Sequence, residues 1–418
     1  MKRILLVLLL LAVPTLRAAG PMDPIAERYV RLALALGEHD PDFVDAYYGP
    51  AEWREQAKKE KKSVEAIESE ARALREQVHA LKIKTHDRLI PMRRTYLDAQ
   101  LGAIVTRAEI LRGKKLPFDE EARQLYGIVP PHHDDAFFAE TLASLEKELP
   151  GSGALADRID SYRKRFDIPA GKLDAVIRRA MHECRARTLM HAKLPAEESF
   201  TVEYVKNQPW SGYNWYKGNY RSVIQINTDL PVSIARALDL ACHEGYPGHH
   251  AFNMLLEKNL VRGRGWVEYS VYPLFSPQSL VAEGSGNYGL ELAFPGAERV
   301  AFDRDVLFPL AGLPPAEAEK FHRVMALSGR LAYAPNEAAR RYLDGSITRE
   351  QAVQWLVHNG LYSEARAQHQ VDFIERYRTY VINYNAGRDA VKAYIESRPR
   401  EMWWAKFIDL ISTPRLLQ

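Results

Sequence analysis

The sequence predicts a mainly α-helical protein with one small β-sheet, and three observations support this fold class. Helical periodicity or helix-forming sequence recurs through residues 24–189 and again through residues 316–384. Only residues 200–227 combine aromatic and alternating apolar residues in the manner typical of strands. Hydrophobic residues are 46% and charged residues 27% of the 418 residues, the composition of a globular protein with one large or two ordinary domains.

Residues 1–19 have the features of a secretory signal peptide. Lys2 and Arg3 precede an apolar run from Ile4 to Val13, and Ala18-Ala19-Gly20 offers small residues for cleavage. The run is shorter than the roughly 20 residues of a membrane-spanning helix, and no cysteine follows it, which argues against a lipoprotein. We therefore expect a periplasmic or secreted protein with no membrane span after cleavage.

The charge balance argues against a nucleic-acid partner. The whole chain has a formal net charge of +3, and Lys2, Arg3 and Arg17 lie in the expected signal peptide. Without them the net charge is about zero, so no positive field remains for a phosphate backbone. The sequence also has no glycine-rich phosphate loop, no Gly-x-Ser-x-Gly motif and no internal repeat.

Residues 20–195 are expected to form a helical N-terminal region. The predicted helices are Pro24–Leu36, Ala51–His79, Asp87–Leu111, Ala136–Leu149, Ala154–Phe166 and Pro169–Leu189. Asp42–Tyr48 is a further short apolar segment. His132-His133-Asp134-Asp135 breaks the helices, and we interpret it as a helix N-cap at Asp134 or Asp135 in preference to a second metal site.

The character of the chain changes near Phe200. Phe200–Val205 and Tyr213–Tyr220 are rich in aromatic residues, and Ser222–Asn227 alternates apolar and polar residues as a strand does. A small sheet is therefore expected in the first part of residues 196–418, followed by helices.

The segment His243-Glu244-Gly245-Tyr246-Pro247-Gly248-His249-His250 concentrates metal-binding residue types. The nearest template is His-Glu-x-x-His on a helix, in which two imidazoles bind zinc and the glutamate activates water. Here the second histidine comes six or seven residues after the first. On a straight helix, six residues turn the side chain away and seven place it about 10 Å along the axis.

Pro247 resolves this spacing. It lacks the N–H that would bond to the His243 carbonyl, and the glycines on either side tolerate unusual dihedral angles. We therefore predict a bulge of about two residues after Glu244. The bulge would turn His249 back towards His243 and leave His250 on the substrate side.

At this motif the chain resembles the bacterial family called domain of unknown function 885, whose signature is His-Glu-Gly-x-Pro-Gly-His-His. That family is similar to gluzincin metallopeptidases such as thimet oligopeptidase and the carboxypeptidase Taq family, which carry His-Glu-Phe-Gly-His. Aligning their Gly-His with Gly248-His249 leaves a two-residue insertion. The resemblance covers roughly residues 200–400, and it implies a gluzincin-like zinc metallopeptidase architecture with residues 196–418 as the catalytic region.

Glu283 is the expected third ligand. Catalytic zinc usually has three protein ligands, and a glutamate from a following helix completes a pair of histidines. The family carries Glu-Gly-Trp-Ala-x-Tyr at this place; Glu283-Gly284 and Tyr288 match it, whereas Ser285 replaces the tryptophan. The predicted ligands of one Zn²⁺ ion are His243, His249 and Glu283.

The same resemblance implies further site residues. Gluzincins stabilise the oxyanion with a late Tyr or His, which nominates Tyr384 and Tyr377. A sheet edge would pair with an extended substrate, and an arginine would hold a substrate carboxylate. Core packing of the tyrosines and a surface location of the arginines are open alternatives. The expected substrate-binding residues are His250, Ile224, Gln225, Tyr288, Arg378 and Arg388.

Cys184 and Cys242 are the only cysteines. In an oxidising compartment they would be able to form one disulfide, and the alternative is two buried free thiols.

Together these features indicate a zinc-dependent metallopeptidase in which Glu244 takes a proton from water and passes it to the leaving amine. The helical first half would favour short peptides. One alternative is a metal-dependent hydrolase of a non-peptide amide or ester. Another is a catalytically inactive secreted binding protein on the same fold, which would have no use for a base at Glu244.

Overall fold

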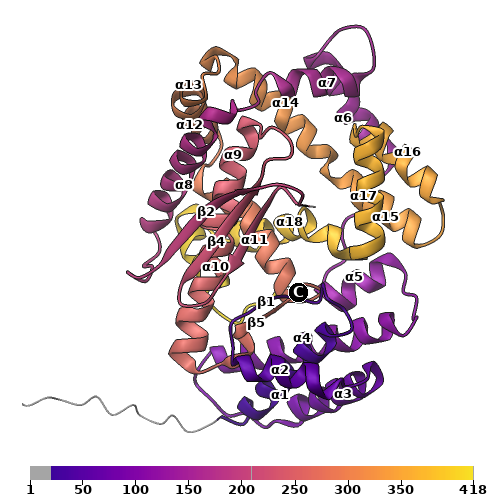
Figure 1. Cartoon of the computed structure of the whole chain (residues 1–418), viewed down its shortest axis with the longest axis vertical. Helices are drawn as coiled ribbons and strands as arrows, with labels where there is room; N and C mark the ends of the chain where they lie inside the picture. The colour runs from indigo at the N-terminus through magenta and orange to yellow at the C-terminus, as the bar shows by residue number, and fades with distance from the viewer. Residues whose placement is uncertain (1–19, 209, 418) are drawn as a thin grey trace, which may run out of the picture.

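Helices make up most of the molecule, and the strands form two small sheets (Figure 1). The computed structural model describes residues 20–208 and 210–417, so the expected signal peptide at residues 1–19 lies outside them. The predicted fold class, mainly α with a small sheet, is confirmed. Within the described ranges, no helix is both long enough and apolar enough to cross a membrane.

The first half of the chain is helical, as expected. Its helices are α1 (Asp23–Gly37), α2 (Ala51–Glu60), α3 (Val64–Ala80), α4 (Leu89–Leu111), α5 (Phe118–Tyr126), α6 (Asp135–Glu148), α7 (Leu155–Lys164) and α8 (Leu173–Leu189). α3 buries Ile67, Ala71, Leu74 and Val78, which lie on one helical face. α6 begins after Asp134, whose side chain accepts a hydrogen bond from the Phe137 N–H at 2.9 Å, so the predicted N-cap is confirmed.

Three strands form the sheet that precedes the motif. They are β2 (Ser199–Val205), β3 (Gly212–Tyr216) and β4 (Arg221–Asn227), in the order β2-β4-β3. β4 pairs parallel with β2 and antiparallel with β3, so β4 is central and β3 is an edge. Ser222, Ile224 and Ile226 of β4 are buried in strict alternation, the pattern that predicted this strand.

A second sheet joins the two halves of the chain. β1 (Val44–Tyr47) pairs antiparallel with β5 (Val271–Pro273), with a register shift between Val44 and Ala46. Asp42–Tyr48, recognised from sequence only as a short apolar segment, therefore contains a strand. Its partner lies more than 200 residues away, which is why no local pattern indicated the pairing.

The motif helix has three parts. α9 (Ile234–Leu240) continues into a π-helical turn at Ala241–Gly245, and α10 (His249–Leu256) resumes after Tyr246-Pro247-Gly248. A Cys184–Cys242 disulfide ties the π-turn to α8. Of the two open states of the cysteines, the paired one is present.

The rest of the chain is mostly helical. α11 (Pro277–Ala293) packs against α18 (Ala386–Glu396) and against the π-turn. The remaining α-helices are α12 (Ala297–Phe302), α13 (Phe308–Ala311), α14 (Ala318–Arg330), α15 (Ala334–Leu343), α16 (Arg349–Gly360), α17 (Glu364–Tyr377) and α19 (Trp403–Leu410). α17 ends earlier than the sequence predicted, because Arg378 has a φ of 52° and the chain continues as a 3-10 turn over Arg378–Asn383.

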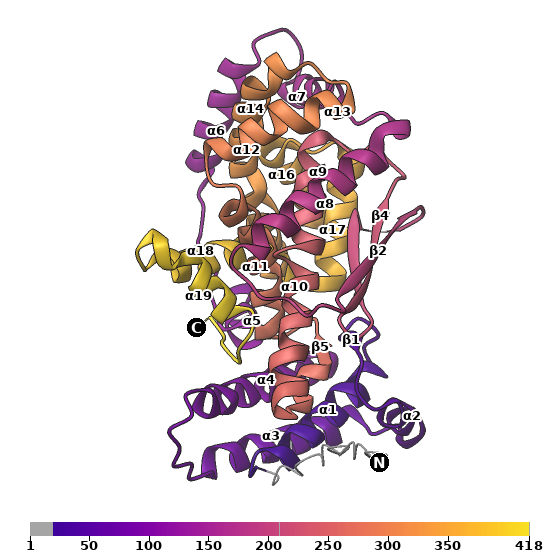
Figure 2. The same ribbon diagram turned by 90° about the vertical axis from the view of Figure 1, so that its left-hand side faces the viewer.

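The molecule is elongated, and α10 and α11 occupy its middle. α1, α3 and α4 lie at one end, and α6, α7, α13 and α14 lie at the other (Figures 1 and 2). The sheet of β2, β4 and β3 flanks α10 on one side. The motif residues are therefore positioned at the middle of the molecule.

Candidate metal centre

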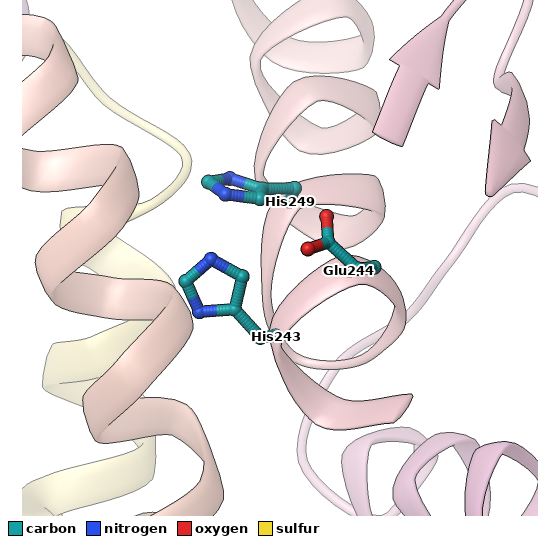
Figure 3. A group of neighbouring side chains, drawn as sticks. All are labelled: His243, Glu244 and His249. Atoms are coloured by element: carbon teal, nitrogen blue, oxygen red, sulfur yellow. The ribbon is translucent and has the colours of Figure 1, made fainter. Parts of the chain in front are cut away.

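The interrupted helix brings His243 and His249 together. The Gly248 N–H bonds to the Cys242 carbonyl at 3.0 Å, which closes the gap around Pro247. The two imidazole centroids lie 4.5 Å apart, and the rings are turned towards one space beside the helix (Figure 3). The helix is interrupted as the spacing predicted, although the distortion starts at Ala241, before Glu244.

Glycine makes this turn possible. A Cβ atom on Gly248 would lie 1.9 Å from the His243 carbonyl oxygen, so no larger residue fits without moving the backbone.

Glu283 approaches the two rings from α11. Its Oε2 atom lies 3.3 Å from His243 Nε2, and its Oε1 atom lies 3.7 Å from His249 Nε2. α11 comes this close because glycines face the motif helix. A Cβ on Gly286 would lie 2.8 Å from His243 Nδ1, and one on Gly289 would lie 2.8 Å from Pro247 Cγ.

The distances between Glu283 and the two rings suit a tetrahedral cation such as zinc. Ligand atoms that are each about 2.0–2.1 Å from such an ion lie about 3.3 Å from one another, close to the separations between Glu283 and the two rings. Glu283 Oε2 is also buried and forms no hydrogen bond within the described part of the chain. It lies 3.3 Å from His243 Nε2, and a metal ion placed between these two atoms would bind both.

Asn287 orients the first ring. Its Oδ1 atom lies 3.0 Å from His243 Nδ1, and its amide donates to the Tyr384 carbonyl at 2.7 Å. A proton on Nδ1 leaves the Nε2 lone pair free, and Nε2 is the atom that faces Glu283. Tyr380 acts similarly on the carboxylate, because its hydroxyl donates to Glu283 Oε1 at 2.9 Å.

Glu244 faces the same space as the two rings. It is buried beside the edge strand, where a Cβ on Gly212 would lie 3.1 Å from Glu244 Oε1. The Asn214 amide donates to the Glu244 carbonyl at 2.6 Å. One ligand atom each of His243, Glu244 and His249 lies within 4.8 Å of the others, so by distance Glu244 is also close enough to share an ion with the two rings.

The electrostatics of the centre favour a cation. Burial raises the pKa of Glu244 to about 7 and lowers the pKa of His249 to about 4. Burial opposes the charge of Glu283, but the two imidazoles and the Tyr380 hydroxyl lower its pKa to about 2. Burial also opposes a proton on His243, but the carboxylates of Glu283 and Glu244 raise its pKa to about 9. A metal would therefore compete with that proton.

A cleft of about 3190 Å³ opens onto the centre. Its walls include the side chains of the centre itself, which are His243, Glu244, His249 and Glu283. They also include three residues nominated from the late part of the sequence, Tyr377, Tyr384 and Arg388. Tyr384 is 41% exposed as a residue and lines the cleft. Arg388 pairs with Asp389 at 2.5 Å and lies 3.4 Å from Glu291, so two carboxylates already neutralise much of its charge. Tyr380 also lines the cleft, and neither spacing nor composition distinguished it from its neighbouring tyrosines.

His250 does not reach the cleft. Its ring is fully buried, with Nδ1 2.7 Å from Ser222 Oγ and Nε2 3.1 Å from Glu198 Oε2. Glu198 also accepts a hydrogen bond from Tyr246 and pairs with Arg185 at 2.6 Å. The expected substrate-side position of His250 was wrong, because α10 has resumed by this residue and directs it into the protein.

The sheet edge is a different strand from the one expected. Ile224 and Gln225 lie on β4, which β2 and β3 flank. Ile224 is fully buried, and the Gln225 side chain bonds to Trp215 and Glu203. Neither residue lines the cleft, whereas β3 does along its whole length. The alternation that identified β4 carries no information about strand order.

Tyr288 and Arg378 also lie away from the cleft lining. Tyr288 is buried, and its hydroxyl donates to Glu396 at 3.2 Å. Arg378 pairs with the buried carboxylate of Glu121 at 2.6 Å and joins the 3-10 turn to α5. Neither is placed to bind a substrate beside the centre.

The comparisons with known proteins show the fold and not the activity. No family model and no curated protein matches this chain, so the resemblance to the domain 885 family stays a prediction. A predicted lipoprotein from Colwellia psychrerythraea is 14% identical with a TM-score of 0.52, over 94% of this chain and 74% of that one. Its fold is therefore similar.

Two further structures are more distant. A predicted lipoprotein of unknown function from Shewanella oneidensis is 11% identical with a TM-score of 0.46, over 93% of this chain and 80% of that one. The M32 carboxypeptidase from Deinococcus radiodurans R1 is 14% identical with a TM-score of 0.38, over 95% of this chain and 96% of that one. At these TM-scores neither likeness carries an argument about this chain.

Proposed function

We propose that this chain is a periplasmic or secreted metallopeptidase that holds one zinc ion with His243, His249 and Glu283. The observation that carries the proposal is the position of Glu283 Oε2, a buried acceptor with no hydrogen bond in the described chain, 3.3 Å from an imidazole nitrogen. A purely structural zinc site is closed by four protein ligands. Here Glu244 lies beside the two rings, where its carboxylate would be able to accept and release a proton.

The chemistry follows from the roles of these side chains. A bound zinc ion would polarise a substrate carbonyl and acidify a water molecule. Glu244, which faces the same space, would accept the proton of the attacking water and deliver it to the leaving amine. The Tyr384 hydroxyl would donate to the developing oxyanion, Tyr377 would line the wall beyond it, and Arg388 would bind a substrate carboxylate.

The size of the cleft supports a peptide substrate. Its volume of about 3190 Å³ is larger than the roughly 300–1,000 Å³ of sites for small ligands. Its walls come from both halves of the chain, including β1 and α7 of the N-terminal region. Residues 20–195 would therefore limit access to short peptides, while residues 196–418 supply the reacting groups.

A conservative substitution of the base tests this function. The Glu244→Gln variant should bind zinc as the wild type does, but its hydrolysis of a library of short peptides should fall about 10²- to 10⁴-fold. Glu203→Gln, the same change on the exposed strand β2, should leave turnover unchanged. Undiminished peptide hydrolysis by zinc-loaded Glu244→Gln would refute the assigned role.

A further inference from the structure

Asp45 occupies a bulge in the N-terminal strand beside the cleft. β1 pairs Val44 with Pro273 and Ala46 with Tyr272, so Asp45 lies between the two pairs without a partner on β5. Bulges of this kind redirect a side chain and are frequent next to active sites. The Tyr213 hydroxyl, on edge strand β3, donates a hydrogen bond to Asp45 Oδ1.

Asp45 differs from its acidic neighbours because it has no counter-charge. Asp42 pairs with Arg376 at 2.6 Å, and Asp239 pairs with Arg299 at 2.8 Å. Among the described residues, the one bond of the Asp45 side chain is the bond from Tyr213. Burial raises the pKa of Asp45 to about 6, and the nearby Glu283 adds to this effect while Tyr213 opposes it. A partly buried carboxylate without a cation is costly.

The surroundings of Asp45 would stabilise a positive ligand. Asp45 lines the same cleft as Glu244 and Glu283, and its charge contributes to the raised pKa of Glu244. The Tyr213 ring lies 4.5 Å from the Trp215 ring and 5.4 Å from the Trp210 ring, which gives an aromatic wall. Aromatic faces and carboxylates both attract cations. One Zn²⁺ ion would not by itself balance the three carboxylates of Asp45, Glu244 and Glu283.

We propose that Asp45 binds a primary ammonium group of the peptide substrate. The group is either the free amino terminus or a lysine side chain, because both present the same charge and the same three donors. This inference rests on the proposed peptidase function and narrows its substrates to peptides with an ammonium group near the scissile bond. Asp45 Oδ2 would accept a hydrogen bond from the ammonium group, while Oδ1 accepts the hydrogen bond from the Tyr213 hydroxyl.

Peptide binding without turnover tests this subsite. Zinc-loaded Glu244→Gln protein is titrated by calorimetry with tetra-alanine, N-acetyl-tetra-alanine and an N-acetylated tetrapeptide containing one lysine. At least one ammonium-bearing peptide should bind about tenfold or more tightly than N-acetyl-tetra-alanine, as for a charge-assisted hydrogen bond. The peptide that shows the preference identifies the source of the ammonium.

Introducing Asp45→Asn into the zinc-loaded Glu244→Gln protein should abolish the preference for the ammonium-bearing peptide. Asparagine can still accept the hydrogen bond from Tyr213, but it carries no charge. Asp42→Asn is the matched control on the same wall and should keep the preference, because that carboxylate is already paired with Arg376. Thermal unfolding verifies that both variants fold.

Equal or absent binding of all three peptides, or a preference that survives Asp45→Asn, overturns the proposal. The proposed function fails separately, if wild-type protein with zinc hydrolyses no peptide even though the ammonium preference is observed.

Discussion

A single methyl group on α11 should weaken metal binding without unfolding the protein. The Cβ introduced by Gly286→Ala would lie 2.8 Å from His243 Nδ1, whereas ordinary contacts begin at 3.4 Å, so the ring must move by about 0.6 Å. Metal–ligand distances tolerate only about 0.2 Å. We expect zinc affinity to fall about 10- to 100-fold, as for other changes that misorient a ligand.

Competition with a chromogenic chelator measures this loss, and thermal unfolding of the metal-free variant measures stability. Alanine is favoured over glycine in helices by about 1 kcal/mol, which offsets part of the crowding, so the Tm should change by only about a few degrees. Gly329→Ala on α14 is the control, because its Cβ would meet no atom within 4 Å. Unchanged zinc affinity in Gly286→Ala would show that the His243 ring does not bind the metal from this position.

Three further changes should have distinct effects. Tyr380→Phe removes the hydrogen bond to Glu283, so zinc affinity in the chelator assay should fall about 2- to 10-fold. An unchanged affinity would show that this hydrogen bond does not help Glu283 to bind the metal. Glu198 is partly buried, yet its hydrogen-bonding partners lower its pKa to about 2, so its stabilising effect is complete above pH 4.5 and disappears as the pH falls towards 2. The Tm of Glu198→Gln should therefore fall less than that of the wild type between pH 5 and pH 2.5, and parallel curves would refute this. Replacing Cys184 and Cys242 with serine removes a disulfide that spans 58 residues, so the free energy of unfolding measured by urea denaturation should fall by about 4 kcal/mol. An unchanged free energy of unfolding would contradict this expectation.

The fold class and the position of the centre could be predicted because their signals are local. Helices such as α3 have an apolar period that can be read within one segment. The interruption between His243 and His249 followed from the missing N–H of Pro247 and from helix geometry alone. Glu283 could be nominated because the resembling family carries a Glu-Gly segment at this place, and the structure has glycines at the points where α11 approaches the motif.

The rest depends on tertiary arrangement. Strand order placed β4 in the centre of its sheet, which moved Ile224 and Gln225 away from the cleft. His250 faces inwards because of the direction in which α10 resumes, one residue earlier. Asp45 gains its position from a bulge against a strand far away in sequence. None of these arrangements has a signature within a window of ten or twenty residues.

The metal content of the purified protein decides whether these side chains form a metal centre. Mass spectrometry of the metal bound to the wild type, His249→Ala and His250→Gln should give about one zinc per chain for the wild type and for His250→Gln, and almost none for His249→Ala. A stoichiometric ion in His249→Ala, with loss of metal only in His250→Gln, would contradict the assignment.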